Sequence, residues 1–296
     1  MEETLAILET AQPDGLGAKR RDFRALKTTG SDSMDQFMNH RAELVIASLL
    51  AEASISFRFN TKAGPDLLLG EDGNVFGIEI SSRRPKSLSD LGRLLHLGLR
   101  ARGLPSSVSI SSEPIPPVTI RHDVRNSIIE QFLPADGAKG VTSLRVMAAP
   151  AQPEHGIPAS WVTIQVTGGQ GRAAMSAPRN SPHMIATAQQ VAQGVLRGKR
   201  KPRQAQMCPT VLIVDLTGTD LPDLRHWKQA FEGVWEPGDG FLAVGAMVAH
   251  SVQRQPTLRF SINPFVDQRL VEEVAARVDA SLVFADLNKQ ITRNPQ

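Results

Sequence analysis

The stretch Gly64–Ser81 decides how the fold is interpreted. It reads Gly-Pro-Asp-Leu-Leu-Leu-Gly-Glu-Asp-Gly-Asn-Val-Phe-Gly-Ile-Glu-Ile-Ser. Two apolar runs flank the polar cluster Gly70–Asn74, and this composition is typical of a β-hairpin with a tight connection. Counting back from the turn brings Asp66 within about one register step of Glu79. A bulge that aligns the two strand faces would let these two side chains converge.

The position of Glu79 between Ile78 and Ile80 is unusual for a carboxylate. Burying an unpaired charge is costly, and a bound cation or a proton is the simplest remedy. Asp66 and Glu79 together would offer the hard oxygen ligands that Mg²⁺ or Mn²⁺ requires. The hairpin therefore predicts metal-assisted chemistry on phosphate.

A helix is predicted over residues 33–53, before the hairpin. Its apolar side chains recur at near-helical spacing, and Ser and Asp residues are available as N-caps. Glu43 lies in the middle of this helix beside the apolar stripe. The order along the chain is a helix with Glu43, a strand that starts at Pro65-Asp66, and a strand with Glu79.

This order resembles the PD-(D/E)XK (restriction-endonuclease-like) nuclease superfamily, over roughly residues 33 to 86 and through a short motif. The resemblance implies an α/β restriction-endonuclease-like core with a mixed central sheet flanked by helices. It also implies a Mg²⁺- or Mn²⁺-dependent nuclease that hydrolyses phosphodiester bonds in DNA. Asp66 and Glu79 match the two motif carboxylates that hold the metal, and Glu43 matches the helical acid, a further or water-mediated ligand.

Ser81 departs from the family pattern, which has a lysine two residues after the position of Glu79. That lysine helps to orient the attacking water and supports the charge that grows on phosphate, and a serine hydroxyl carries no charge to replace it. By the period-two rule, Arg83 shares a strand face with Glu79 and Ser81. Arg83 or Lys86 is the expected replacement. The alternative is a catalytically degenerate nuclease fold that binds nucleic acid or a protein partner.

A second alternative centres on Asp215. The apolar run Val211–Val214 followed by Asp-Leu-Thr-Gly-Thr resembles the first motif of haloacid-dehalogenase-like phosphatases, in which the Asp is the nucleophile. Only 81 residues follow (296 − 215), and they contain no paired-carboxylate motif to bind the metal. A core strand that ends in a polar turn explains the same residues.

Charge distribution supports a nucleic-acid partner more than net charge does, because the net charge is only +3. The basic clusters include Lys19–Arg21 with Arg24 and Lys27, Arg83-Arg84-Pro85-Lys86, and a stretch with Lys199, Arg200 and Lys201. Such clusters attract phosphate backbones through counterion release. The second cluster follows the candidate metal strand directly, so Arg83, Arg84 and Lys86 are expected to contact DNA, with Lys199, Arg200 and Lys201 as a further contact. A homodimer is compatible with the sequence.

The cellular setting follows from composition. A 41% hydrophobic and 21% charged chain has the ordinary balance of a globular protein. One cysteine, Cys208, suits a reducing compartment and excludes a disulfide framework. There is no apolar stretch of membrane-spanning length and no signal-peptide pattern, so we expect a cytoplasmic protein without membrane contact.

Alternating helix and strand patterns predict the rest of the chain. A helix and a basic linker are expected over 1–32, then a nuclease-like α/β domain with a C-terminal extension over 33–296. Within it, helices are expected at 87–102, 124–133, from 182, at 221–231 and 267–278, and strands at 107–112, 143–148, 161–166, 210–216, 241–249 and 258–262. Residues 168–181 are expected to form a loop.

Overall fold

The computed structural model describes residues 2–26, 33–70, 75–83, 88–104, 106–113, 122–151, 153, 159–168, 173–176, 182–198, 201–217, 224–248 and 256–277. The chain divides into two compact units. The first unit comprises Met1–Arg83, Gln189–Gly218 and Leu224–Gln296, and the second comprises Arg84–Ala188 and Thr219–Asp223. The division falls inside the range 33–296, which the sequence predicts to be one α/β domain.

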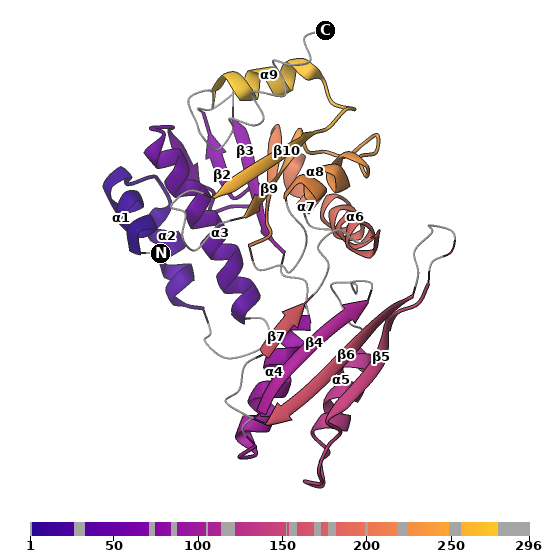
Figure 1. The fold of residues 1–296 in the computed structure, drawn as a ribbon. Helices are drawn as coiled ribbons and strands as arrows, with labels where there is room; N and C mark the ends of the chain where they lie inside the picture. Colours follow the sequence, from indigo (N-terminus) through magenta and orange to yellow (C-terminus); the bar gives the residue numbers. More distant parts are fainter. Residues whose placement is uncertain are drawn as a thin grey trace. The chain divides into compact units, whose positions relative to one another are not determined.

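The first unit is built on a six-stranded mixed sheet with the order β1-β2-β3-β8-β9-β10 (Figure 1). Its strands are β1 (Phe57–Phe59), β2 (Leu67–Leu69), β3 (Phe76–Ser82), β8 (Thr210–Asp215), β9 (Ala243–Val248) and β10 (Thr257–Ile262). β1, β2 and β3 pair antiparallel, β3, β8 and β9 pair parallel, and β10 pairs antiparallel with β9. The predicted α/β class with a mixed central sheet is confirmed.

Helices flank this sheet on both sides (Figure 1). They are α1 (Glu2–Ala11), α2 (Leu16–Arg24), α3 (Ser33–Glu52), α6 (Pro182–Leu196), α7 (Lys201–Ala205), α8 (Leu224–Glu232) and α9 (Gln268–Arg277). α1 to α3 lie on one side of the sheet, and α6 to α8 lie on the other.

Strand alternation determines which side chains meet α3. Ile78 and Ile80 of β3 belong to one hydrophobic core with Leu44 and Leu50 of α3. Because successive strand residues point to opposite faces, Glu79 points to the face away from α3. The sequence Ile-Glu-Ile therefore covers both faces of the sheet, and both faces are buried at β3.

The second unit has a four-stranded sheet with the order β5-β6-β4-β7. Its elements are α4 (Leu88–Ala101), β4 (Ser106–Glu113), α5 (His122–Phe132), β5 (Ser143–Ala149), β6 (Ser160–Gly168) and β7 (Ala173–Ser176). The leucines of α4 that recur every three or four residues pack with Ile128 and Phe132 of α5 on alternate residues of β4 and β6. This unit therefore has a core of its own.

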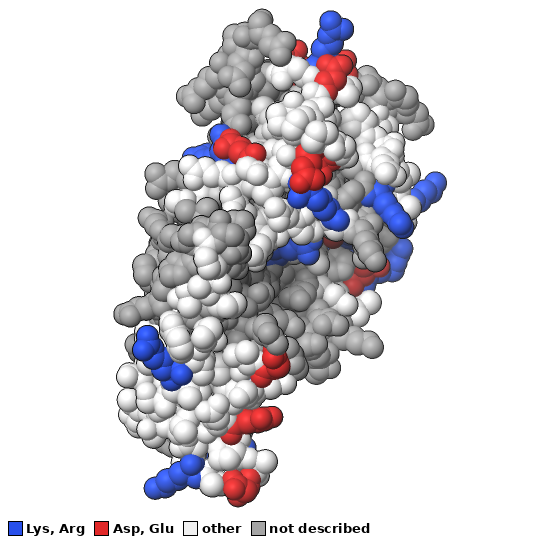
Figure 2. All heavy atoms as spheres, turned by 90° about the vertical axis from the view of Figure 1, so that its right-hand side faces the viewer, with Lys and Arg blue, Asp and Glu red and all other residues white. Residues whose placement is uncertain are grey.

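Surface charge is mixed on one face of the molecule. On the face drawn in Figure 2, Lys and Arg side chains lie interspersed with Asp and Glu side chains. Within the described ranges, no helix is both long enough and apolar enough to cross a bilayer.

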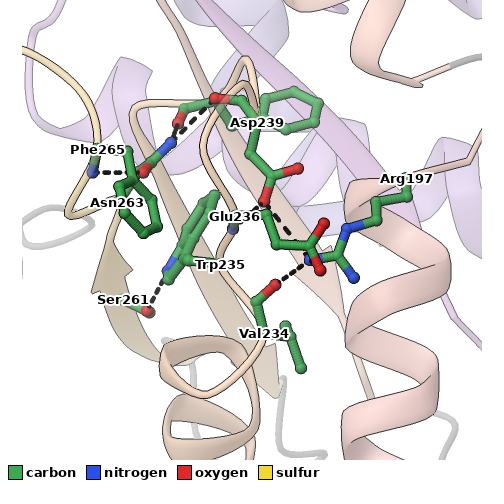
Figure 3. Close-up of polar contacts among 9 residues, drawn as sticks. Arg197, Val234, Trp235, Glu236, Asp239, Ser261, Asn263 and Phe265 are labelled. Atoms are coloured by element: carbon green, nitrogen blue, oxygen red, sulfur yellow. Dashed lines mark hydrogen bonds and ion pairs between the residues drawn. The ribbon is translucent and has the colours of Figure 1, made fainter.

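Asn263 fixes the loops at one end of the sheet (Figure 3). Its Nδ2 donates to the backbone oxygens of Asp239 at 3.0 Å and Phe241 at 2.9 Å, and its Oδ1 accepts from the N–H of Phe265 at 2.9 Å. Arg197, directly after α6, forms an ion pair with Glu236 at 2.9 Å in the same loop. A buried side chain with every polar atom bonded is well suited to hold two loops together.

Most predicted elements are present, with shifts of one to three residues at their ends. The stretch predicted as a linker over 12–32 contains α2 instead, since residues 16–24 are helical. β7 lies within the predicted loop 168–181, and β1 and α7 were not predicted at all. These elements are short or polar, so they lack a sustained hydrophobic period.

Candidate functional site

The candidate site lies along the edge of β3 beyond the end of β2. β2 pairs only with Phe76–Ile78, whereas β3 continues to Ser82. The next edge-facing amides are therefore satisfied by side chains: the N–H of Ile80 donates to Oδ2 of Asp66 at 2.8 Å, and the N–H of Ser82 donates to Oδ1 of Asn39 at 2.8 Å. Asp66 and Asn39 thus continue the ladder where the partner strand has stopped.

The two predicted carboxylates flank the end of the ladder between β2 and β3. Leu67 pairs with Ile78 and Leu68 with Gly77, so the predicted hairpin is present. Asp66 directly precedes Leu67 and Glu79 directly follows Ile78, so these two carboxylates come next after the last pair of the ladder. Glu79 is completely buried, whereas Asp66 is partly exposed. The pair therefore combines one carboxylate inside the sheet with one at its edge.

Gly77 allows this part of the chain to pack closely. A Cβ at Gly77 would lie 2.4 Å from Cγ of Pro65 and 2.8 Å from Oγ1 of Thr210. Only a residue without a side chain lets Pro65 lie against β3 at this distance. The Pro-Asp dipeptide is thereby held in place immediately before β2.

Glu43 is also buried, and its carboxylate forms an ion pair with the ammonium group of Lys19 on α2. Both side chains are largely buried, at 15% exposure for Lys19 and 9% for Glu43. Among the described residues, no three His, Cys, Asp or Glu side chains gather in a way that could hold a metal ion. Glu43 therefore does not complete a three-carboxylate group with Asp66 and Glu79.

The pKa of His40 depends on burial and on the charged side chains around it. Burial lowers the pKa of its imidazole, and the Lys19 ammonium lowers it further. The carboxylates of Asp22 and Asp66 act on the same pKa in the opposite direction. Phe23 of α2 meets the His40 ring edge-on, with ring centroids 6.5 Å apart. α2, α3 and the start of β2 thus meet around His40.

Ser81 follows Glu79 on the same face of β3, and Arg83 comes directly after the strand. Ser81 is buried, at 3% exposure. Arg83 is partly buried, and burial lowers the pKa of its guanidinium. The backbone N–H of Arg83 donates to the carbonyl oxygen of Asp215 at 2.9 Å, which holds the end of β3 against β8.

The remaining predicted contacts fall largely outside the described part of the chain. Arg84, Lys86, Lys199 and Arg200 lie outside the described residues. Lys201 begins α7, but its side chain is not among those described.

Asp215 occupies a closed polar cluster at the carboxyl end of β8. Its Oδ2 lies 3.2 Å from Nη2 of Arg41, which comes from α3. Its Oδ1 accepts hydrogen bonds from the backbone N–H of Thr217 at 2.9 Å and from the Thr217 hydroxyl. Asp215 is completely buried, so both of its oxygens are engaged inside the protein.

Sequence reasoning did not single out Asn39 or Arg41, and it assigned Lys19 to a basic cluster rather than to an ion pair with Glu43. The helical spacing of Leu16, Lys19 and Phe23 was a signal for α2, because positions three and four apart share a helix face. Comparison of the chain with protein-family models, with curated proteins and with solved structures finds no match in any of the three.

Proposed function

We propose that this chain is a restriction-endonuclease-like protein that hydrolyses phosphodiester bonds in DNA, with Mg²⁺ or Mn²⁺ held by Asp66 and Glu79. The observation that supports the proposal is the register of β2 and β3, whose last pair, Leu67 and Ile78, is followed directly by Asp66 on one strand and Glu79 on the other. The order of elements adds support: α3 precedes an antiparallel β1-β2-β3 unit, and β8 lies parallel to β3.

The donor atoms suit a hard divalent cation. Asp66 uses Oδ2 to accept the N–H of Ile80, and this bond orients the carboxylate. Mg²⁺ is usually bound through one or two carboxylates, with water and substrate phosphate completing its shell. A metal held there would lower the pKa of a bound water and neutralise charge on the phosphate.

The chain must also supply the positive charge that Ser81 does not carry. Arg83, two residues further along the chain, is one source. Lys19 is a second source, because it is a largely buried cation held by Glu43 beside His40. We assign the role to Arg83, which follows Ser81 at the end of β3, because Lys19 is paired with Glu43 of α3, on the side of the sheet that Glu79 faces away from.

The test combines metal binding with cleavage. Wild-type protein should bind Mn²⁺ in a calorimeter and cut duplex DNA with Mg²⁺ or Mn²⁺. Glu79→Gln should abolish both, whereas Glu130→Gln, which removes an exposed carboxylate from α5, should change neither. Arg83→Met should lower cleavage by more than Lys19→Met while leaving Mn²⁺ affinity nearly unchanged. Wild-type protein that binds no metal and cuts no DNA or RNA would refute the proposal.

A specific observation favours a second candidate, a nuclease fold kept for binding DNA or a protein partner. Ser81 is buried in the place of the family's lysine, and the Glu43 carboxylate is engaged by Lys19. This candidate predicts DNA binding that is unaffected by Glu79→Gln and is accompanied by no cleavage under any metal condition.

A further inference from the structure

The outward face of α2 carries a concentration of positive charge beside the candidate site. Its nine residues, Leu-Gly-Ala-Lys-Arg-Arg-Asp-Phe-Arg, contain four cations and a single acid. On the face of the molecule drawn in Figure 2, the two signs are instead interspersed. α2 is therefore a place to look for a polyanionic partner.

The inner side of α2 determines which cations face outward. Leu16 is buried, Lys19 pairs with Glu43, and the Phe23 ring contacts the rings of Phe37 and His40. These positions are spaced three and four apart, so they occupy one helix face. That face is fixed against α3, and the helix cannot rotate without breaking these contacts.

The outer side of the helix presents Arg21 and Arg24, whereas Arg20 flanks the inner face. Arg21 and Arg24 are exposed and three residues apart, so their side chains lie on the same side. Within the part of the chain that the structure describes, neither forms an ion pair, whereas Arg20 pairs with Glu9 at 2.7 Å. Two adjacent guanidinium groups are thus available to a phosphate backbone.

Backbone hydrogen bonds connect the start of α2 to Asp66. The N–H of Phe59 donates to the carbonyl oxygen of Asp14 at 2.8 Å, and the N–H of Asn60 donates to that of Asp66 at 2.9 Å. Gly15, with a φ of +81°, lies so close to β1 that an added Cβ would be 2.7 Å from the Phe59 oxygen. α2 therefore starts at the same end of β1 at which Asp66 enters β2.

We propose that Arg21 and Arg24 of α2 bind the phosphate backbone of duplex DNA and position it beside the edge of β3. This inference rests on the proposed function for the choice of DNA as the occupant. The charge of the face supports that choice, because arginine guanidinium groups bind phosphate oxygens in bidentate fashion and release counterions from the duplex. A surface of this kind would bind DNA without regard to sequence.

The experiment measures affinity for a fluorescent DNA duplex by anisotropy, with EDTA present so that no cleavage occurs, over a series of salt concentrations. Arg21→Gln/Arg24→Gln should weaken binding at least tenfold in low salt. It should also reduce the slope of log affinity against log salt by about 1.8, at ~0.9 per lost phosphate contact. The matched control is Arg100→Gln/Arg102→Gln, which removes two exposed charges from the end of α4 and the residues after it. Circular dichroism and a melting curve verify that each variant is folded.

The outcomes separate this inference from the proposed function. Equal losses in the two double variants, an unchanged slope, or wild-type protein that binds no duplex would overturn the role of α2. If wild-type protein binds duplex through Arg21 and Arg24 yet cuts nothing with Mg²⁺ or Mn²⁺, the inference stands and the nuclease proposal fails. If it cuts DNA and the α2 variant binds normally, only the inference fails.

Discussion

Oδ2 of Asp66 accepts the backbone N–H of Ile80 at 2.8 Å, two residues beyond Ile78, the last residue of β3 that pairs with β2. The Asp66 carboxylate therefore satisfies a backbone N–H at the sheet edge in addition to its proposed role as a metal ligand. An unpaired N–H on an edge strand can form a hydrogen bond with a strand of another chain, and a side-chain acceptor such as Asp66 prevents this. Substitutions at Asp66 separate the two roles.

Asp66→Asn should keep the protein stable and remove metal binding. The amide oxygen of Asn still accepts the N–H of Ile80, but the ligand charge is gone. Asp66→Ala loses both, and we expect it to lower the free energy of unfolding by about 0.5–1.5 kcal/mol, the usual contribution of one hydrogen bond. Urea unfolding and Mn²⁺ calorimetry on both variants provide the measurements. Full Mn²⁺ affinity in Asp66→Asn would contradict the assignment.

The ion pair between Arg41 and Asp215 should make a large contribution to stability. Asp215 is completely buried, and Arg41→Met removes the cation that the described residues provide for its carboxylate and leaves the Thr217 hydrogen bonds, at a cost of about 3 kcal/mol. Arg41→Met/Asp215→Leu should cost less than the sum of the single changes, which chemical denaturation of the three variants measures. Additive losses would argue against direct coupling.

Asp215 also tests the phosphatase alternative. If it were a nucleophile, wild-type protein would hydrolyse a phosphate monoester such as p-nitrophenyl phosphate, and Asp215→Asn would stop the reaction while keeping the fold. We expect no such activity, because Arg41 and Thr217 engage both carboxylate oxygens.

The stability of the protein should depend on pH through His40. Burial and Lys19 place the folded-state pKa of His40 below the ordinary value of 6.5. The unfolded chain then binds more protons than the folded one as pH falls below about 6.5, so the free energy of unfolding falls with it. His40→Phe, which retains a ring beside Phe23, should lose less stability than wild-type between pH 7.5 and 5.5. Identical urea midpoints against pH would show that His40 contributes nothing.

The hairpin and the principal helix were predictable because their signals are local. The polar turn between two apolar runs predicts β2 and β3, and the apolar period of residues 33–53 predicts α3. The contacts of the site are not local: Arg41 and Asp215 are 174 residues apart in sequence, and Asn39 meets Ser82 across 43. α2 was not predicted because its inner face contains Lys19. A lysine in the sequence indicates a solvated position, and its burial is explained only by the ion pair with Glu43 in the folded structure.

Two glycine substitutions test the packing that positions Asp66. Gly77→Ala would place a Cβ 2.4 Å from Pro65, between β3 and a proline ring with little room to move. We expect the free energy of unfolding to fall by about 1–3 kcal/mol, as for other overpacked cores. Mn²⁺ binding should also weaken, because a displaced Pro65 would displace the neighbouring Asp66. Gly194→Ala is the matched control, since it adds a Cβ on an exposed part of α6 with nothing within 4 Å. It should raise stability by about 0.5–1 kcal/mol, because alanine is the better helix former, and leave Mn²⁺ affinity unchanged. Thermal unfolding and calorimetry on both variants provide the readouts, and a Gly77→Ala protein as stable as wild-type would show that Pro65 does not set the position of Asp66 against β3.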